Sequence, residues 1–252
     1  MGSAERLLDG RVALVTGGSR GLGRTIARAL AAAGAKGVSL DADPGEPPDG
    51  WSAERVDVRD VSALQAAIRG TSERLGGLDV VVANAGVVPP WRETENLDFD
   101  EWDRVFAVNV RGVAATISAA VPALRRSSAG SVIAMASVNA RRGHPRQCLY
   151  TASKHAVVGI VRAAALDLGR HGVRVNAIAP GPVATEALVE RVRGRAAGDG
   201  AAAEQALGDM AAETALGRLA TEDEVSSLAL FLASERSSGM SGQVLTVDAG
   251  LS

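Results

Sequence analysis

The run Thr16-Gly17-Gly18-Ser19-Arg20-Gly21-Leu22-Gly23 follows a short apolar stretch, Val12–Thr16, and opens a helical pattern. Glycines in such a loop allow a tight turn and a close approach of the backbone to a pyrophosphate, and the free amides of the helix N-terminus then face the anion. The spacing is Gly-x-x-x-Gly-x-Gly, not the common Gly-x-Gly-x-x-Gly. A turn with a structural role only is the alternative. Strand, loop and helix in this order predict a dinucleotide site with contacts from Gly17, Ser19, Arg20, Gly21, Leu22 and Gly23.

Outward from this loop, short apolar runs alternate with longer helical patterns, which is typical of βαβ units and a parallel sheet. Several runs are apolar without alternation, as expected for strands covered on both faces. The predicted strands are Val12–Thr16, Val38–Asp41, Arg55–Asp57, Val80–Asn84, Ser131–Ser137, Arg174–Ala179 and Val244–Asp248. The predicted helices are Leu22–Ala33, Val61–Leu75, Asp100–Arg126, Ser153–Leu168 and Glu222–Ala233. The pattern predicts an α/β, Rossmann-like fold: a doubly wound seven-stranded parallel sheet with helices on both faces, in a single domain over residues 1–252.

Two segments depart from this alternation. The run Asp43-Pro44-Gly45-Glu46-Pro47-Pro48-Asp49-Gly50 cannot form a helix, although parallel neighbours normally need a crossover of about a dozen residues or more. The stretch Glu186–Leu216 is rich in alanine and interrupted by glycines. It predicts one or two weak helices with hinges, either a mobile substrate flap at about residues 186–216 or a poorly ordered surface excursion.

The composition narrows the class of protein. The chain has 252 residues, 46% of them hydrophobic and 22% charged, and a net charge of −2. It has no basic block, which argues against a nucleic-acid partner. We find no signal-peptide pattern and no apolar run long enough for a bilayer, and the single cysteine, Cys148, suits a reducing compartment. The expectation is a cytoplasmic protein without a membrane partner. His144, His155 and His171 lack the spacing of metal ligands, so no metal is expected.

Tyr150 and Lys154 lie four residues apart, so their side chains share one face of a helix. A phenol has a reference pKa of about 10, and a nearby ammonium favours the phenolate. The pair therefore predicts a tyrosine of lowered pKa that donates or accepts a proton near pH 7. Ser137 closes the strand-like run upstream. An isolated Tyr-x-x-x-Lys is most often a surface helix pair, and the glycine loop is what favours the chemical interpretation.

The end of the second predicted strand bears on the choice of cofactor. Asp41 stands where an acid can accept hydrogen bonds from both hydroxyls of the adenosine ribose, and its charge would repel a 2′-phosphate. Arg20 favours the opposite choice, because a guanidinium beside the loop could pair with that phosphate. Ala42 and Asp43 add no cation. The sequence therefore favours NAD, with NADP as the alternative.

With these residues in place, the chain resembles the classical short-chain dehydrogenases/reductases from Gly10 to Gly250. Ala83-Asn84-Ala85-Gly86 is similar to the family's Asn-Asn-Ala-Gly, and Val108-Asn109-Val110 matches the segment with the asparagine of its catalytic tetrad. The resemblance implies a tetrad of Asn109, Ser137, Tyr150 and Lys154. It also implies cofactor contacts from Tyr150 and Lys154 and from Asp57, Val58, Asn84, Ala85, Gly86, Pro180, Gly181, Val183 and Thr185.

The resemblance also implies roles. Tyr150 would protonate the oxygen of a ketone, or deprotonate an alcohol in the other direction, while Ser137 polarises that oxygen. Lys154 would lower the tyrosine pKa and hold the nicotinamide ribose, and Asn109 would anchor a water of a proton relay. Thr185 and the backbone of Val183 would bind the carboxamide. The missing helix after Asp41 puts the adenine edge of the pocket in doubt, but it does not touch the tetrad.

These observations predict an NAD-dependent oxidoreductase for a secondary alcohol or ketone, assembled as a homotetramer like its relatives. One alternative is an NADPH-dependent 3-oxoacyl-(acyl carrier protein) reductase, favoured by Arg20 and by Arg125 and Arg126 at a helix end. A remote alternative is a non-catalytic dinucleotide-binding regulator, although such proteins typically lose the Tyr or the Lys. The loop cluster of Arg141, Arg142 and Arg146 either receives an anionic substrate or is solvated, and Trp91 forms either a pocket wall or part of the core.

Overall fold

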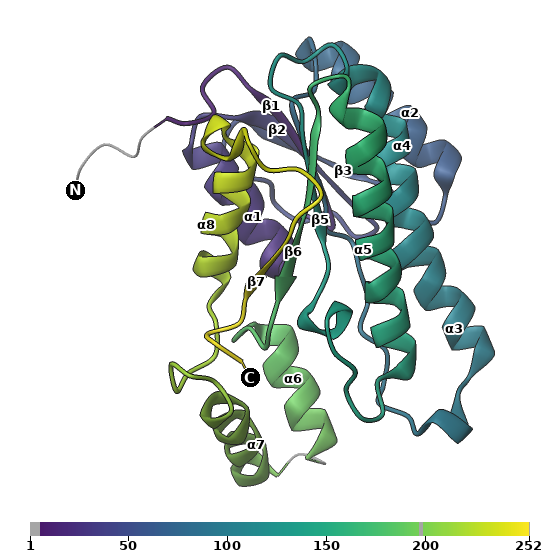
Figure 1. Cartoon of the computed structure of the whole chain (residues 1–252), viewed down its shortest axis with the longest axis vertical. Coiled ribbons are helices and arrows are strands. Elements are labelled where there is room, and N and C mark those ends of the chain that lie inside the picture. Colours follow the sequence, from purple (N-terminus) through teal and green to yellow (C-terminus); the bar gives the residue numbers. More distant parts are fainter. Residues whose placement is uncertain (1–5, 197–198, 252) are drawn as a thin grey trace.

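A computed structural model describes residues 6–196 and 199–251 of the chain (Figure 1). Its centre is one parallel sheet in the order β3-β2-β1-β4-β5-β6-β7. The strands are β1 (Val12–Thr16), β2 (Lys36–Asp41), β3 (Trp51–Arg55), β4 (Val80–Ala83), β5 (Ser131–Met135), β6 (Arg174–Pro180) and β7 (Val244–Val247). The order reverses between β1 and β4, and ligands of such sheets bind outside the carboxyl ends of the strands at this switch point. The predicted seven-stranded fold is confirmed.

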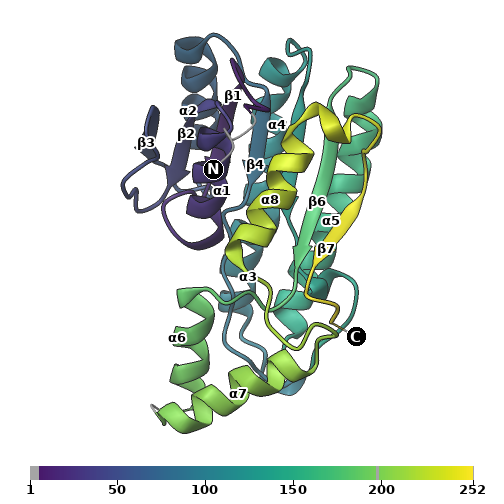
Figure 2. The ribbon, with the colours of Figure 1, turned by 90° about the vertical axis from the view of Figure 1, so that its left-hand side faces the viewer.

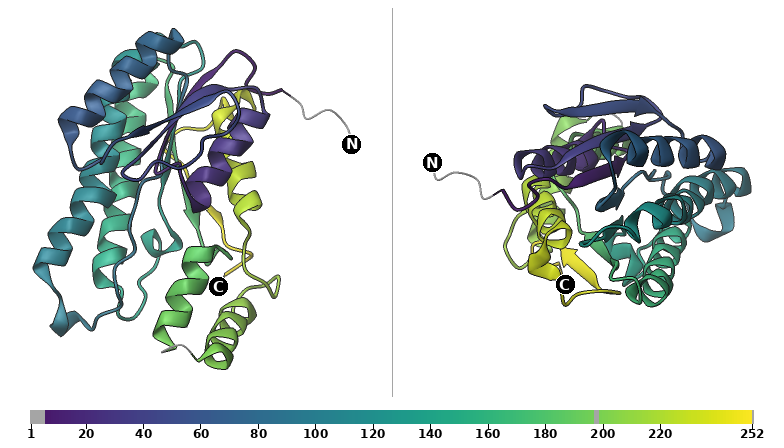
Figure 3. Two further views of the ribbon diagram at one scale, coloured as in Figure 1. Left: turned by 180° about the vertical axis from the view of Figure 1, so that it is seen from behind. Right: turned by 90° about the horizontal axis from the view of Figure 1, so that it is seen from above.

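Helices cover both faces of the sheet, as Figures 1 and 3 show. One face is covered by α1 (Gly21–Ala32) and α8 (Glu222–Ala233), which pack against each other. The other is covered by α2 (Val61–Leu75), α4 (Val113–Leu124) and α5 (Cys148–Gly169). Alternate residues of one strand therefore enter two different cores: Leu14 packs with the α2, α4 and α5 side, and Val15 with the α1 and α8 side. Burial on both faces explains why the strands read as continuous apolar runs.

Two predicted boundaries are wrong. The third strand runs over Trp51–Arg55 rather than Arg55–Asp57, because the Trp51 ring is buried and its Nε1 donates to the Ala35 carbonyl at 2.9 Å. Helix α5 begins at Cys148 rather than Ser153, since its N-cap residue, Gln147, makes no side-chain cap that the sequence could reveal. The remaining predicted limits agree with the observed ones within two residues.

The predicted helix Asp100–Arg126 is not uniform. It consists of α3 (Phe99–Phe106), a π-helical segment (Ala107–Gly112) and α4. A β-carbon on Gly112 would lie 2.8 Å from Cγ2 of Val58, so only glycine lets this segment approach the loop after β3 so closely. A π-helical turn inside an α-helix often marks a functional site.

The same helical stretch corrects another expectation. Phe99–Leu124 has a mean hydropathy of 1.4 over its most apolar window and is long enough to cross a membrane by length and composition. The expected absence of such a run was therefore wrong. Its α4 part packs against α2, α5 and the sheet, and 39% of the most apolar window is buried.

The structure agrees with two predictions for the irregular segments: no helix between β2 and β3, and two helices within residues 186–216. Residues 42–50 contain no helix and link β2 directly to β3. The stretch after β6 forms two helices, α6 (Glu186–Arg195) and α7 (Gly200–Ala212), packed together through Leu188, Val192 and Ala203. Figure 2 shows them beyond the carboxyl end of β6, apart from the layers that cover the sheet. Their mobility stays a prediction.

Candidate active site

The glycine loop between β1 and α1 is shaped as an anion cradle. A β-carbon on Gly23 would lie 1.9 Å from the carbonyl oxygen of Gly17, so no side chain fits there, and Gly17 itself has φ +65°. Asn84, after β4, donates through Nδ2 to the carbonyls of Thr16 at 3.0 Å and Gly17 at 2.9 Å. Arg20 offers no side-chain cap to α1. The first amides of α1, from Gly21 onward, thus have no side-chain partner and suit a phosphate.

Asp41 lies beside this loop at the end of β2. Its Oδ2 accepts from the Ser19 amide at 3.1 Å, and its Oδ1 accepts from the Asp43 amide at the same distance. Ser19 Oγ in turn accepts from the Gly45 amide at 2.9 Å, so the short β2–β3 connection is fastened to the loop. Arg20 is exposed. The carboxylate therefore stands where the sequence predicted it.

Asp57 and Val58, expected among the cofactor contacts, lie just after the end of β3, and their contact with a cofactor stays a prediction. Asp57 is engaged by Arg59, whose guanidinium and amide hydrogen bonds hold the pKa of the Asp57 carboxyl below its usual range. Val58 is buried beneath it. Arg55, which the sequence did not single out, donates to the Ala42 carbonyl at 2.6 Å and pairs with Asp43 at 3.4 Å. The position of Arg55 beside Asp43 follows from the end of β3 at Arg55, which the sequence did not predict.

Lys154 lies at the meeting point of three segments. Its Nζ donates to the Met135 carbonyl at the end of β5 at 2.8 Å, and it lies 5.7 Å from the centroid of the Tyr150 ring. A β-carbon on Gly86 would lie 3.7 Å from this nitrogen and 3.4 Å from Oδ1 of Asn109. The structure thus brings together the residues that the sequence predicted as neighbours: the Tyr-Lys pair, Asn109 and the turn of Asn84, Ala85 and Gly86.

The electrostatics of this pair differ from the prediction. Burial lowers the pKa of Lys154 to about 8. Burial also raises the pKa of Tyr150, against the lowering effects of a side-chain hydrogen bond with Ser137 and of the Arg191 cation. The predicted lowering of the Tyr150 pKa by Lys154 was therefore wrong, because desolvation of the phenolate outweighs its neighbours. Arg191 was not predicted at all.

Ser137 is placed by a residue that sequence reasoning missed. It lies two residues beyond β5, is buried, and its Oγ accepts from the Asn139 amide at 3.2 Å. The Asn139 side chain donates to Gln147 Oε1 at 2.9 Å and to Thr151 Oγ1 at 3.2 Å, which joins the Ser137 turn to α5. The sequence signal for this turn is an asparagine, Asn139, two residues after a serine whose hydroxyl accepts from the Asn139 amide.

Asn109 lies in the π-helical segment and is fully buried. Its Nδ2 donates to the Val87 carbonyl at 2.9 Å and to Ser153 Oγ at 3.2 Å, and its Oδ1 accepts from the Val87 amide at 2.8 Å. The side chain therefore clamps the segment after β4 onto α5. Because both of its polar atoms are engaged, the predicted water anchor would have to be a backbone group.

The residues expected around the carboxamide lie at the same edge of the sheet, after β6. A β-carbon on Gly181, which follows Pro180, would lie 2.7 Å from Cβ of Asp248, so the turn requires glycine. Val183 is buried and bridges to Ala220, and Thr185 caps α6 by accepting from the Leu188 amide at 3.1 Å. Their contacts with a cofactor stay a prediction.

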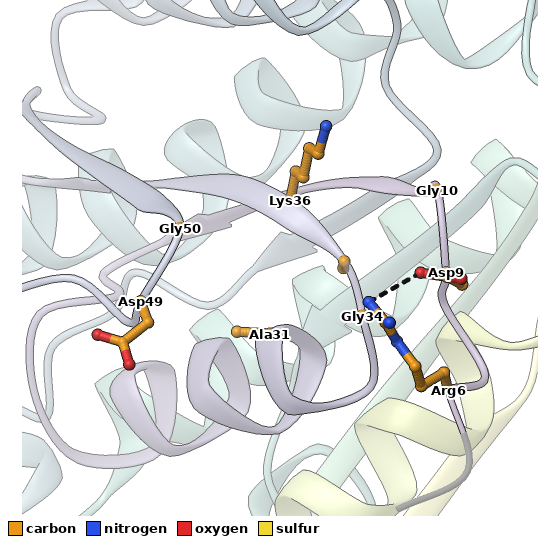
Figure 4. Close-up of a pocket in the computed structure, with 9 residues that line it drawn as sticks. Arg6, Asp9, Gly10, Ala31, Gly34, Lys36, Asp49 and Gly50 are labelled. Atoms are coloured by element: carbon orange, nitrogen blue, oxygen red, sulfur yellow. Dashed lines mark ion pairs between the residues drawn. The ribbon is translucent and has the colours of Figure 1, made fainter.

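Two of the hollows on the described part of the chain differ greatly in volume. The larger, about 540 Å³, is formed around Arg6, Gly34, Lys36 and Gly50 near the amino end of β2 (Figure 4) and contains none of the predicted site residues. A much smaller one, about 10 Å³, is lined by Pro89, Arg146, Cys148 and Tyr150, among others. Cys148 therefore lines the space beside Tyr150.

Comparison with known proteins agrees with this geometry. A family model described as "Enoyl-(Acyl carrier protein) reductase" matches residues 17–252. Short-chain dehydrogenase reductase 3c of Arabidopsis thaliana is 38% identical over 253 residues, which is 96% of this chain and 95% of the relative. The chain belongs to the short-chain dehydrogenase/reductase family. It is thus an oxidoreductase of a family that binds a nicotinamide dinucleotide.

Solved structures of two dehydrogenases share the fold closely. Ligand-free aldohexose dehydrogenase of Thermoplasma acidophilum superposes with a TM-score of 0.92 at 30% identity, over 98% of this chain and 96% of that one. Carveol dehydrogenase of Mycobacterium avium, in complex with NAD, superposes with a TM-score of 0.88 at 32% identity, over 97% and 98%.

The lowered pKa of Lys154 predicts a pH-dependent stability. Between about pH 8 and 10.5 the unfolded chain holds a proton on this amine that the folded chain has released, so the free energy of unfolding should rise with pH. In urea titrations, wild type should gain up to about 3 kcal/mol relative to Lys154→Met across this window. Lys36→Met, at an exposed lysine, is the control for the loss of one amine. A flat difference for Lys154→Met would show that the Lys154 pKa is not lowered by folding.

Proposed function

We propose that this protein is an NAD-dependent oxidoreductase that transfers a hydride between nicotinamide and a secondary alcohol or ketone, with Tyr150 as general acid and base. The observation that carries the proposal is the meeting of Tyr150, buried Lys154 and Ser137 at the carboxyl ends of β4 and β5. The same edge of the sheet carries the glycine cradle. The place of ligand binding in such sheets thus coincides with a proton donor.

When bound, the nicotinamide supplies or accepts the hydride. In the reducing direction Tyr150 gives its proton to the carbonyl oxygen, and in the oxidising direction it takes the proton of the alcohol. Ser137 holds the same oxygen by a hydrogen bond, which stabilises the charge that develops there. Tyr150 thus supplies or takes the proton of the reaction, and the nicotinamide supplies or takes the hydride.

The raised pKa of Tyr150 fits this role. At pH 7 the hydroxyl is protonated and ready to donate, and it forms a phenolate only with help from neighbouring charge. The neighbouring cation that lowers the Tyr150 pKa is Arg191, and the Lys154 amine lies 5.7 Å from the centroid of the Tyr150 ring. The bond to Met135 fixes the amine, and the Asn109 clamp fixes the segment opposite.

The choice of NAD rests on Asp41. Its carboxylate is fastened beside the loop by the Ser19 amide, at the end of β2 where the adenosine ribose would lie. A 2′-phosphate would meet this negative charge, and the nearby Arg55 is already paired with Asp43. NADP stays the alternative because Arg20 is exposed beside the loop.

The second candidate is an NADPH-dependent 3-oxoacyl-(acyl carrier protein) reductase. The matching family model, described as "Enoyl-(Acyl carrier protein) reductase", favours an acyl carrier protein substrate, although an enoyl reductase acts on a C=C bond and not on a 3-oxo group. Against it, Arg125 and Arg126 follow the end of α4 just before β5 begins, so they lie at the amino edge of the sheet. Tyr150 lies at the opposite edge. A carrier docked on these arginines would therefore not reach the site directly.

A non-catalytic regulator is the third and remotest candidate, since both Tyr150 and Lys154 are present.

The assembly and the compartment belong to the same proposal. Helices α4 and α5 lie outermost on their face of the sheet, only 39% of the most apolar window of Phe99–Leu124 is buried, and Leu166 on α5 is 84% exposed. Apolar helices exposed in this way suit a homotetramer in which they meet their copies. A cytoplasmic location agrees with the single cysteine.

Replacing Tyr150 by Phe tests the mechanism. The variant should lose turnover of secondary alcohols by about 10²-fold or more, because the proton donor is gone, while its affinity for NADH stays that of wild type. Steady-state kinetics and NADH fluorescence titration measure the two quantities. His155→Phe, an exposed site one turn further along α5, serves as control. A Tyr150→Phe enzyme with full turnover would refute Tyr150 as the acid and base.

Cofactor choice is tested by removing one charge. Wild type should bind NAD at least about tenfold more tightly than NADP, and Asp41→Asn should remove most of this difference. Asp49→Asn, an exposed carboxylate later in the same β2–β3 connection, should keep it. Isothermal titration of both cofactors measures the ratio. A wild-type preference for NADP would favour the acyl-carrier-protein reductase instead.

A further inference from the structure

Cations gather around Trp91 from segments far apart in the sequence. The guanidinium carbon of Arg195, in the last turn of α6, lies 3.9 Å from the centroid of the Trp91 ring. The guanidinium carbon of Arg146, in the loop before α5, lies 5.1 Å from it. Arg146 has φ +60°, a left-handed conformation that a non-glycine residue adopts at a cost. The backbone is therefore strained at Arg146, the residue that brings this cation to the Trp91 ring.

Arg191 extends this cluster toward Tyr150. It lies four residues before Arg195 on α6, so the two side chains share one face of the helix. Its cation and the Tyr150 hydroxyl are close enough to interact: each shifts the pKa of the other toward the charged form. The Nε of Arg191 is buried and has no hydrogen-bond partner. A buried donor without a partner is costly, and a ligand can remove that cost.

The cluster is short of negative charge. Within the described residues, these three arginines make one ion pair, Arg146 with Glu93 at 4.0 Å, and both of its side chains are exposed. Burial and the charges of Arg191 and Arg146 lower the pKa of Arg195. Nearby Arg92, by contrast, is paired with Glu101 at 3.0 Å. Within the described residues, Arg191 and Arg195 thus make no ion pair, whereas Arg92 does.

We propose that Arg146, Arg191 and Arg195 form an anion subsite, and that the substrate is an oxo or hydroxy compound carrying a carboxylate. This inference rests on the proposed function, since it places the reacting carbonyl at Tyr150. Arg191 would bind the carboxylate through the planar set of donors on its guanidinium. Arg195 and Arg146, which pack against the Trp91 ring, would add positive charge around that carboxylate. The subsite lies partly on α6, so an anionic substrate would also fasten α6 to the loops that precede α5.

The test uses pairs of probes that differ only in charge. Wild-type enzyme is given 2-, 3- and 4-oxo carboxylates and their methyl esters, with NADH. The carboxylate of at least one pair should have the higher kcat/KM by about tenfold or more, and Arg191→Gln should lose about 10- to 100-fold on the carboxylate and little on its ester. Arg191→Lys should keep part of the preference. Arg193→Gln, exposed on the same helix, should match wild type.

Binding separates failure of this inference from failure of the proposed function. Calorimetric titration of each carboxylate into wild type and Arg191→Gln, with saturating NADH, needs no turnover. Weaker binding in Arg191→Gln without turnover of any probe would refute the function and keep the subsite. Turnover with equal efficiency for acid and ester, or equal carboxylate affinity in both proteins, would overturn the subsite. A loss of NADH affinity in Arg191→Gln, with the acid-to-ester ratio unchanged, would assign Arg191 to the cofactor and overturn it too.

Discussion

The burial of one amine organises the site. Lys154 Nζ is held by the Met135 carbonyl at the end of β5, under the Tyr150 ring and against the turn at Gly86. Removing an ammonium from water is costly, which is why its pKa falls to about 8. The structure meets this cost with one backbone hydrogen bond and with the packing of α5 against β5 and β6. Any loosening of α5 would release the amine to solvent and leave Tyr150 without its cationic neighbour.

The same edge of the sheet explains why a cradle for phosphate and a proton donor occur together. Asn84 fastens the glycine loop to the end of β4, and Asn109 fastens the segment just after it to α5. Two asparagines thus join the loop after β1 to the helix that carries Tyr150. Chemistry at the carboxyl ends of the strands can vary through α6 and the neighbouring loops without disturbing this frame, which is where Arg191 and Trp91 lie.

The features that depend on local sequence could be predicted, whereas the features that depend on tertiary packing could not. Gly17 and Gly23 could be read from their place between strand and helix, and the Tyr-Lys pair from its spacing. The start of α5 at Cys148 could not, because Gln147 forms no recognisable cap. The limits of β3 depend on how Trp51 packs, and the raised pKa of Tyr150 depends on burial. Arg191 lay in a segment whose place beside Tyr150 no local pattern reveals.

The acidity of Tyr150 can be measured alone, because it is the only tyrosine of the chain. Its tyrosinate absorbance should be titrated with pH, with and without saturating oxidised NAD, while circular dichroism monitors folding. The midpoint should lie above about 10 without NAD, and it should fall when the positively charged nicotinamide binds beside the hydroxyl. A midpoint at the ordinary value that NAD leaves unchanged would contradict the placement of a partly buried, charge-controlled proton donor at the cofactor site.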